Sequence, residues 1–120
     1  MEIRYKETHD GTSIAASGSS TSDVIDLGTK YPEGFFSLQI TLTGDGTAKV
    51  EYLLSNDGTN FLEPSEADDI LSSFTKISGP GSDGKDMFSF TPMLARFMKI
   101  KCTETAGANA ITPVITLVYQ

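Results

Sequence analysis

The chain has 120 residues, 38% of them apolar, which is enough to build one domain around a single packed core. Its 16 acidic and 9 basic residues give a formal charge of -7, which opposes binding to the phosphate backbone of nucleic acids. No apolar run is long enough to span a membrane, and the single cysteine excludes an internal disulfide and a cysteine-based zinc site.

The chain begins with MEIRYKETHDG, a charged stretch that lacks the apolar segment of a secretory signal. We therefore expect synthesis in the cytoplasm, and a reducing place of assembly agrees with the single cysteine. One domain is expected over residues 1–120, with an N-terminal arm over about residues 1–22. Residues 2–8 and 23–27 are weaker strand candidates, whereas residues 17–23 are expected to form a loop because they offer nothing to bury.

The clearest strand is FFSLQITLT at residues 35–43, because apolar and polar side chains alternate along it. Residues 47–55 repeat this alternation. The side chains expected to face the core from the two runs are Phe36, Leu38, Ile40, Leu42, Val50, Tyr52 and Leu54. Gly-Asp-Gly at 44–46 separates the runs and is typical of a tight turn, so we predict that they pair as a hairpin.

The segment PSEADDILSSF at residues 64–74 is the one helical candidate. Ser65 and Asp68 have the spacing of a capping box, and Ile70 and Phe74 lie one helical turn apart. One or two turns of helix are expected there.

Two more strands are predicted near the end of the chain, at residues 95–103 and 110–120, because both are rich in β-branched and alternating apolar residues. In the first, Met98, Ile100 and Cys102 share the apolar face, so the thiol is expected to be buried. Pro113 cannot donate to a strand ladder, so the last strand is expected to start beyond it, or to lie at an edge or bulge there. A loop at 78–84 and a weaker strand at 87–90 precede these two strands.

Seven to nine short strands with turn signals every ten or so residues predict an all-β fold. We expect an antiparallel β-sandwich of the jelly-roll type with at most one short helix, because two sheets would then cover each other's apolar faces.

The run SNDGTN at residues 55–60 interrupts an apolar strand. Asn and Asp side chains bond their own backbone and Gly58 takes a positive φ readily, so a structural turn is the favoured interpretation. A calcium site that uses Asp57 and Asp68 is the alternative, although the spacing does not match an EF-hand loop. No metal or cofactor is predicted.

No catalytic group of residues is recognisable, so we predict that the protein is not an enzyme. His9 is the sole histidine and lies beside Asp10 and Gly11, where a solvated turn histidine is expected. No nucleophile elbow surrounds any serine.

Aromatic residues in the expected loops and on outward strand positions are candidates for a binding surface. Tyr31, Phe61 and Phe97 could contact a protein partner or a planar sugar ring, and Ile3 and Tyr5 extend this candidate assembly surface onto the N-terminal arm. A carbohydrate-binding module is therefore the alternative function, although such modules commonly use tryptophan and this chain has none.

Three segments, SDVIDLG, FFSLQITLTGDGTAKVEYLLSNDGTNF and ARFMKIKCTETAGANAITPVITLVYQ, resemble small β-sandwich proteins from the structural gene clusters of tailed phages and prophages. The resemblance covers roughly residues 22–120 and carries no catalytic residues. It implies a virion component that is made in the bacterial cytoplasm: a capsid decoration or head-fibre protein, or a neck or tail accessory. The partners that it implies are capsid or tail proteins and copies of the chain itself, with surface glycans as the alternative, and neither nucleic acid nor a membrane.

Overall fold

The computed structural model describes residues 3–28 and 34–120, and this part of the chain forms nine β-strands and no helix. The strands are β1 (Arg4–Asp10), β2 (Ser19–Thr21), β3 (Ile25–Asp26), β4 (Phe36–Thr43), β5 (Ala48–Ser55), β6 (Leu71–Phe74), β7 (Lys85–Phe90), β8 (Phe97–Glu104) and β9 (Thr112–Tyr119). None of the described residues belongs to a helix that could cross a membrane.

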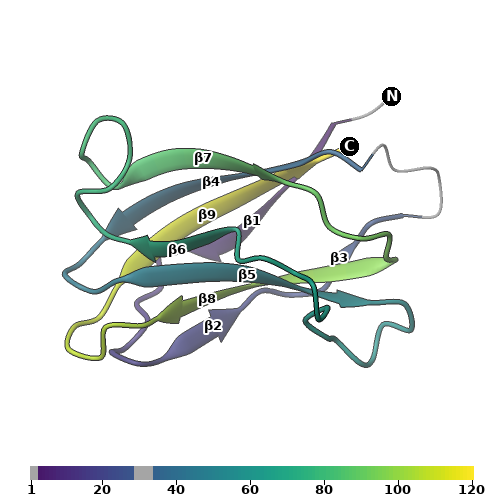
Figure 1. The fold of residues 1–120 in the computed structure, drawn as a ribbon, viewed down its shortest axis with the longest axis horizontal. Coiled ribbons are helices and arrows are strands. Elements are labelled where there is room, and N and C mark those ends of the chain that lie inside the picture. Colours follow the sequence, from purple (N-terminus) through teal and green to yellow (C-terminus); the bar gives the residue numbers. More distant parts are fainter. Residues whose placement is uncertain (1–2, 29–33) are drawn as a thin grey trace.

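The strands form two antiparallel sheets that pack face to face, as predicted (Figure 1). Sheet 1 has the order β1-β9-β4-β7, and sheet 2 has the order β2-β8-β5-β6, with the short β3 also paired to β8. If β2 and β3 are counted as one interrupted strand, the first strand pairs with the last, the second with the next to last, and so on inward. This is the pairing of a long hairpin rolled into a jelly roll.

The strands predicted at residues 35–43 and 47–55 are confirmed as β4 and β5, but the prediction that they pair as a hairpin is wrong. β4 lies in sheet 1 and β5 in sheet 2, so the Gly-Asp-Gly segment carries the chain across the core from one sheet to the other. A Cβ on Gly46 would lie 2.6 Å from the carbonyl oxygen of Asn109, so the crossing requires a residue without a side chain.

The helix predicted in residues 64–74 is also wrong, because the segment ends in strand β6. Its register against β5 changes between the pairs Ala48–Phe74 and Val50–Leu71, so β6 uses one more residue than β5 over this span. Ser73 takes a φ of 54° at this bulge. The extra residue places the buried Leu71 and Phe74 three positions apart, and the partly buried Ile70 lies four positions before Phe74, so the apolar spacing resembles one face of a helix.

Pro113 lies inside β9, which begins at Thr112 and occupies the centre of sheet 1, and the register of β9 with β4 is continuous through Leu42–Pro113. The prediction that this strand starts beyond the proline, or lies at an edge or bulge there, is therefore wrong. The pairing of β1 with β9 ends at Asp10 and Val114, and Val114 is the residue that follows the proline. The carbonyl of Pro113 still accepts a hydrogen bond from the N–H of Gly11 at 2.8 Å. The proline therefore stands where the ladder needs no N–H.

The loop expected at residues 17–23 contains strand β2, whereas the loop at 78–84 has no strand, as predicted. β2 has little to bury, but its backbone pairs with β8 at the edge of sheet 2. Just after it, the buried Ser22 hydroxyl accepts a hydrogen bond from the N–H of Ile100 at 3.0 Å. Backbone pairing, rather than apolar burial, determines this strand.

The core lies between the two sheets and consists of the inward side chains that the alternation predicted. Six of the predicted inward side chains are fully buried, namely Leu38, Ile40, Val50, Met98, Ile100 and Cys102, and so are Ile115 and Leu117 of β9. Each buried side chain of this size contributes roughly 1.5–3 kcal/mol to the free energy of unfolding. An aromatic cluster closes one end of the core, where the ring of Phe90 lies 5.4 Å from that of Phe36 and 5.5 Å from that of Tyr52.

Glu104, the last residue of β8, joins the loops at the opposite end of the core from the aromatic cluster. The residue is only 1% exposed, so its charge needs hydrogen-bond partners within the protein. Its Oε1 accepts hydrogen bonds from the backbone N–H groups of Ser17 and Gly107 at 3.0 and 2.7 Å. Its Oε2 accepts from those of Thr47 and Ala106, both at 2.9 Å. These bonds lower the pKa of Glu104 from 4.5 to about 2. One side chain thus joins three loops from distant parts of the sequence.

We predict that Glu104→Gln lowers the Tm at pH 7 by roughly 5 °C or more, because the amide NH₂ would face backbone donors. Since folding lowers the pKa, the contribution of Glu104 is present above about pH 4.5 and is lost as the pH falls toward about 2. Thermal unfolding of both proteins between pH 7 and pH 2.5 measures this. The exposed Asp45→Asn is the matched control, and an equal Tm loss in both variants would contradict the assignment.

Candidate functional site

The break at residues 56–60 is a structural turn, as its side-chain chemistry predicted. Oδ1 of Asp57 accepts hydrogen bonds from the N–H groups of Thr59 and Asn60 at 2.9 and 2.8 Å and from the Ser55 hydroxyl at 2.8 Å. Oδ2 accepts from the Asn60 side-chain amide at 2.8 Å. These bonds lower the pKa of Asp57 well below 3.8. Both carboxylate oxygens are therefore used within the turn.

The turn returns the chain to its own strand and docks on a neighbouring loop. Leu54 and Leu62 exchange two backbone hydrogen bonds of 2.8 and 2.9 Å across it. Asn56 Oδ1 accepts a hydrogen bond from the N–H of Arg96 at 3.2 Å, and Gly58, with a φ of 76°, packs against the Phe97 ring. These contacts fix the loop before β8 beside the turn.

An apolar groove of about 420 Å³ lies between this turn and that loop. We call it the loop-end groove, and the residues that matter in it are Leu54, Asn60, Leu62, Pro64, Met93 and Leu94. Three of its apolar side chains are strongly exposed: Leu62 by 67%, Met93 by 64% and Leu94 by 83%. Large apolar side chains around a groove are more common on surfaces that bind a partner than on surfaces that stay in contact with water.

The loop-end groove belongs to one end of the sandwich. Residues 56–64, residues 91–96 and the C-terminal end of β9 lie at the right-hand end in Figure 1, whereas the loops joined by Glu104 lie at the left-hand end. A second hollow of about 330 Å³ lies near the chain ends, between Ile3, Phe35 and Val118. Ile3 and Phe35 are each 65% exposed there.

The structure divides the aromatic and arm residues that the sequence singled out between two faces. Phe61 and Phe97 lie on the outside of sheet 2, where the Lys99 ammonium lies 4.4 Å from the centroid of the Phe61 ring and the Arg96 guanidinium 5.1 Å from that of Phe97. One face of each ring is thus covered by a cation, which leaves less room for a stacked sugar. Ile3 and Tyr5 lie on sheet 1, and Tyr31 falls outside the described residues.

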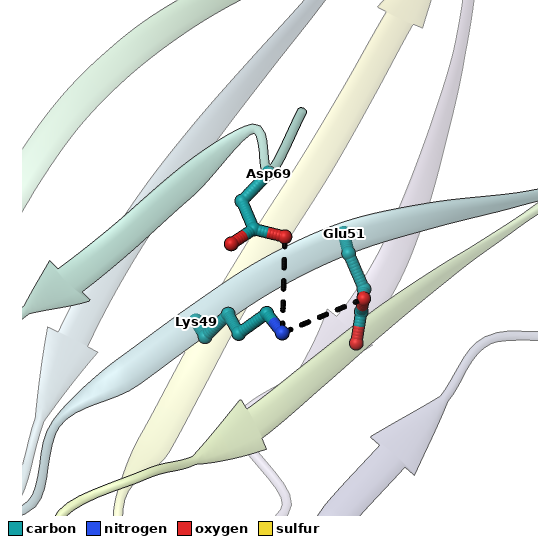
Figure 2. A network of polar contacts seen from close by, with 3 residues as sticks. All are labelled: Lys49, Glu51 and Asp69. Atoms are coloured by element: carbon teal, nitrogen blue, oxygen red, sulfur yellow. Dashed lines mark ion pairs between the residues drawn. The ribbon is translucent and has the colours of Figure 1, made fainter. Parts of the chain in front are cut away.

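A network of charges crosses the outside of sheet 2 (Figure 2). Lys49 Nζ lies 3.7 Å from Oε2 of Glu51 and 3.8 Å from Oδ1 of Asp69. Burial, followed by repulsion from Glu63, raises the pKa of Glu51 above 4.5. Glu51, Glu63 and Asp69 are the described acidic residues close enough to share an ion, so neither Asp57 nor Asp68 belongs to the group. The lysine balances part of this negative charge.

His9 is not the solvated turn histidine that its neighbours suggested, because it is only 6% exposed. A register shift in β1 between Glu7 and His9 turns its side chain inward. There Nε2 lies 2.9 Å from the Ser20 carbonyl oxygen, and Nδ1 lies 3.1 Å from the Thr8 hydroxyl. Burial lowers the pKa of His9 below 6.5. The ring joins β1 to β2 and thereby the two sheets.

The sequence interpretation did not select Leu62, Met93 or Leu94. Pro92, Met93 and Leu94 form an apolar run in the loop between two predicted strands. An apolar run in a loop is the one local signal in the sequence that points to the groove. Only the fold shows that this run lies beside the Asp57 turn.

No protein-family model and no curated protein sequence matches the chain. Similarity to known proteins is found in the fold. A chain from infectious bursal disease virus, Gx strain, superimposes with a TM-score of 0.54 at 7% identity, over 98% of this chain and 31% of that one. A chain from the infectious bursal disease virus VP2 subviral particle gives 0.53 at 11% identity, over 98% and 32%.

The SPBc2 prophage-derived protein YomS has a TM-score of 0.49 at 10% identity, over 98% of this chain and 92% of that protein. The present chain spans about a third of the length of the two viral chains. At these identities the similarity to the viral chains shows a shared β-sandwich fold.

We predict that Asp57→Ala lowers the Tm by roughly 2–5 °C, because the turn loses the acceptor for two backbone N–H groups. Thermal unfolding measures this, with the exposed Asp68→Ala as the matched control. Calcium and a chelator should leave the Tm of the unmodified protein unchanged, since the oxygens of Asp57 are already used. A calcium-dependent rise that Asp57→Ala abolishes would contradict this account.

Cys102 is fully buried in the core, and burial raises the pKa of its thiol to about 12. We therefore expect no reaction with Ellman's reagent at pH 8 in the folded protein and one thiol per chain after unfolding in guanidinium chloride. Stoichiometric labelling of the folded protein within minutes would show that the thiol is accessible.

Proposed function

We propose that the chain is a non-enzymatic structural subunit of a phage particle and acts by binding other proteins of that particle. The observation that carries this proposal is the loop-end groove with its exposed Leu62, Met93 and Leu94. Interface centres are poor in charge and rich in large apolar side chains, among which methionine is enriched. The hydrogen bonds of Asn56 and Asp57 hold the groove in a fixed shape, so little conformational freedom is lost when a partner binds.

The fold supports the same proposal. Jelly rolls are common in viral capsid proteins, and a chain of the VP2 subviral particle shares this architecture over nearly the whole length of the present chain. The motif resemblance to phage structural proteins favours a capsid decoration protein or a neck or tail accessory. The place of action is then the virion, after synthesis in the bacterial cytoplasm.

The test uses quantitative mass spectrometry to count copies of the chain in purified particles. Particles from cells that produce the unmodified chain are compared with particles from cells that produce a variant. We predict that Leu94→Asp removes the chain from the particles without lowering its Tm, because this side chain is exposed and contributes little to folding. Ile77→Asp is the matched control, since Ile77 is 68% exposed but lies in the connection from β6 to β7 at the opposite end.

Hundreds of copies per particle would identify a capsid-surface component, and about a dozen a neck or tail component. A chain that stays in the soluble lysate, with none in the particles, would overturn the proposal. Equal loss of both variants would remove the loop-end groove as the contact surface.

A further inference from the structure

The outer face of sheet 1 carries exposed side chains from all four of its strands. The registers of β1 with β9, of β9 with β4 and of β4 with β7 arrange its outward side chains in three rows across the sheet. The residues at the two ends of the rows are Tyr5 and Ser89, Glu7 and Met87, and Asp10 and Lys85. Gln39, in the middle of this face, is exposed to solvent.

The two outer faces of the sandwich differ in charge. Between the row ends, β9 and β4 present valine, threonine, serine and glutamine to the outside of sheet 1. The outside of sheet 2 carries Lys49, Glu51, Lys99 and Lys101 on its two central strands. A charge-free centre with charged edges is the composition of a protein interface rather than of a solvated face.

The same face has a strongly exposed aromatic side chain and a hollow. Tyr5, on β1, is 78% exposed. At the other side of the same row, Ser89 lines the 330 Å³ hollow that also contains Phe35 and Val118. A second copy whose β1 lies over this β7 would bring its Tyr5 to the hollow.

We propose that two copies of the chain pack through the outer faces of sheet 1, related by a twofold axis parallel to the strands. This operation turns the sheet over and exchanges its edges, so β1 of each copy lies over β7 of the other in the same row. Tyr5 then meets the hollow beside Ser89, and the Asp10 carboxylate meets the Lys85 ammonium, each contact occurring twice. Aligned face-to-face packing is the common arrangement of two β-sheets.

Charge selects this axis over the other twofold axis in the plane of the sheet. An axis perpendicular to the strands would place β1 over β1, so Glu7 would face Glu7 of the second copy. It would also move Lys85 away from Asp10. Like charges brought together across an interface are unfavourable, whereas the axis along the strands pairs opposite charges.

The interface is of modest size. Four strands about 4.8 Å apart and about six residues long cover roughly 400 Å² in projection. Two such faces approach the lower limit of about 1,000 Å² for a specific interface, so we expect a dissociation constant of roughly 10–100 µM. The dimer adds self-association to the proposed particle subunit and is tested separately from it.

Sedimentation equilibrium of the purified chain from about 1 to about 300 µM tests the dimer over the expected range. Gln39→Glu places two like charges near the axis and should weaken the dimer at least about 30-fold. Thr21→Glu, which also introduces a glutamate but on the outside of sheet 2, is the control and should dimerise as the unmodified chain does. Thermal unfolding checks that each variant folds.

Asp10→Lys and Lys85→Glu provide a second test that does not depend on Gln39. Each variant alone brings like charges together and should be monomeric, whereas an equimolar mixture should recover the dimer because both contacts again join opposite charges. An unmodified chain that is monomeric at all concentrations, a different stoichiometry, or a dimer that Gln39→Glu leaves intact would overturn the inference. A monomer that is still found in particles would overturn the dimer alone and leave the proposed function standing.

Discussion

The carboxylate of Glu104 is the constraint on which the arrangement of the strands depends most. A jelly roll carries its chain repeatedly from one sheet to the other, and each crossing leaves backbone N–H groups that no strand ladder satisfies. Glu104 accepts four of them from the loops after β1, β4 and β8. Because the four donors come from three separate segments, one side chain fixes the relative position of both sheets at that end.

The other end of the sandwich is built in a different way. Apolar and aromatic contacts close it, and the loops there project Leu62, Met93 and Leu94 outward instead of joining one another through a buried polar group. An end satisfied by internal hydrogen bonds has little to offer a partner, whereas an end with exposed apolar groups gains free energy when it is covered. The difference between the ends is therefore the strongest structural reason to expect a partner at the loop end.

Alternation of apolar and polar residues located the long strands and their inward side chains, but it could not determine which strands pair. The period-two pattern shows which face of a strand is buried. Two strands have the same pattern whether they pair as a hairpin or lie in opposite sheets, as β4 and β5 do. Bulges shifted the period at His9 and at Ser73, so these segments were misassigned. The Asp57 turn was predictable because its hydrogen bonds are local. The groove beside Met93 was not, because loops far apart in the sequence form it.

The surfaces available for assembly are limited further by the free edge of β7. The N–H of Leu42 donates to Gly84, so alternate residues of β7 face β4, and the N–H groups of Lys85 and Met87 point away from the sheet. Asp83 and Asp86 accept hydrogen bonds from these two groups at 3.3 and 2.8 Å. A strand added at this edge would have to displace both carboxylates, which is a common protection against edge pairing. The proposed assembly through the outer face of sheet 1 and through the loop end avoids that cost, because neither surface requires a backbone hydrogen bond to be broken.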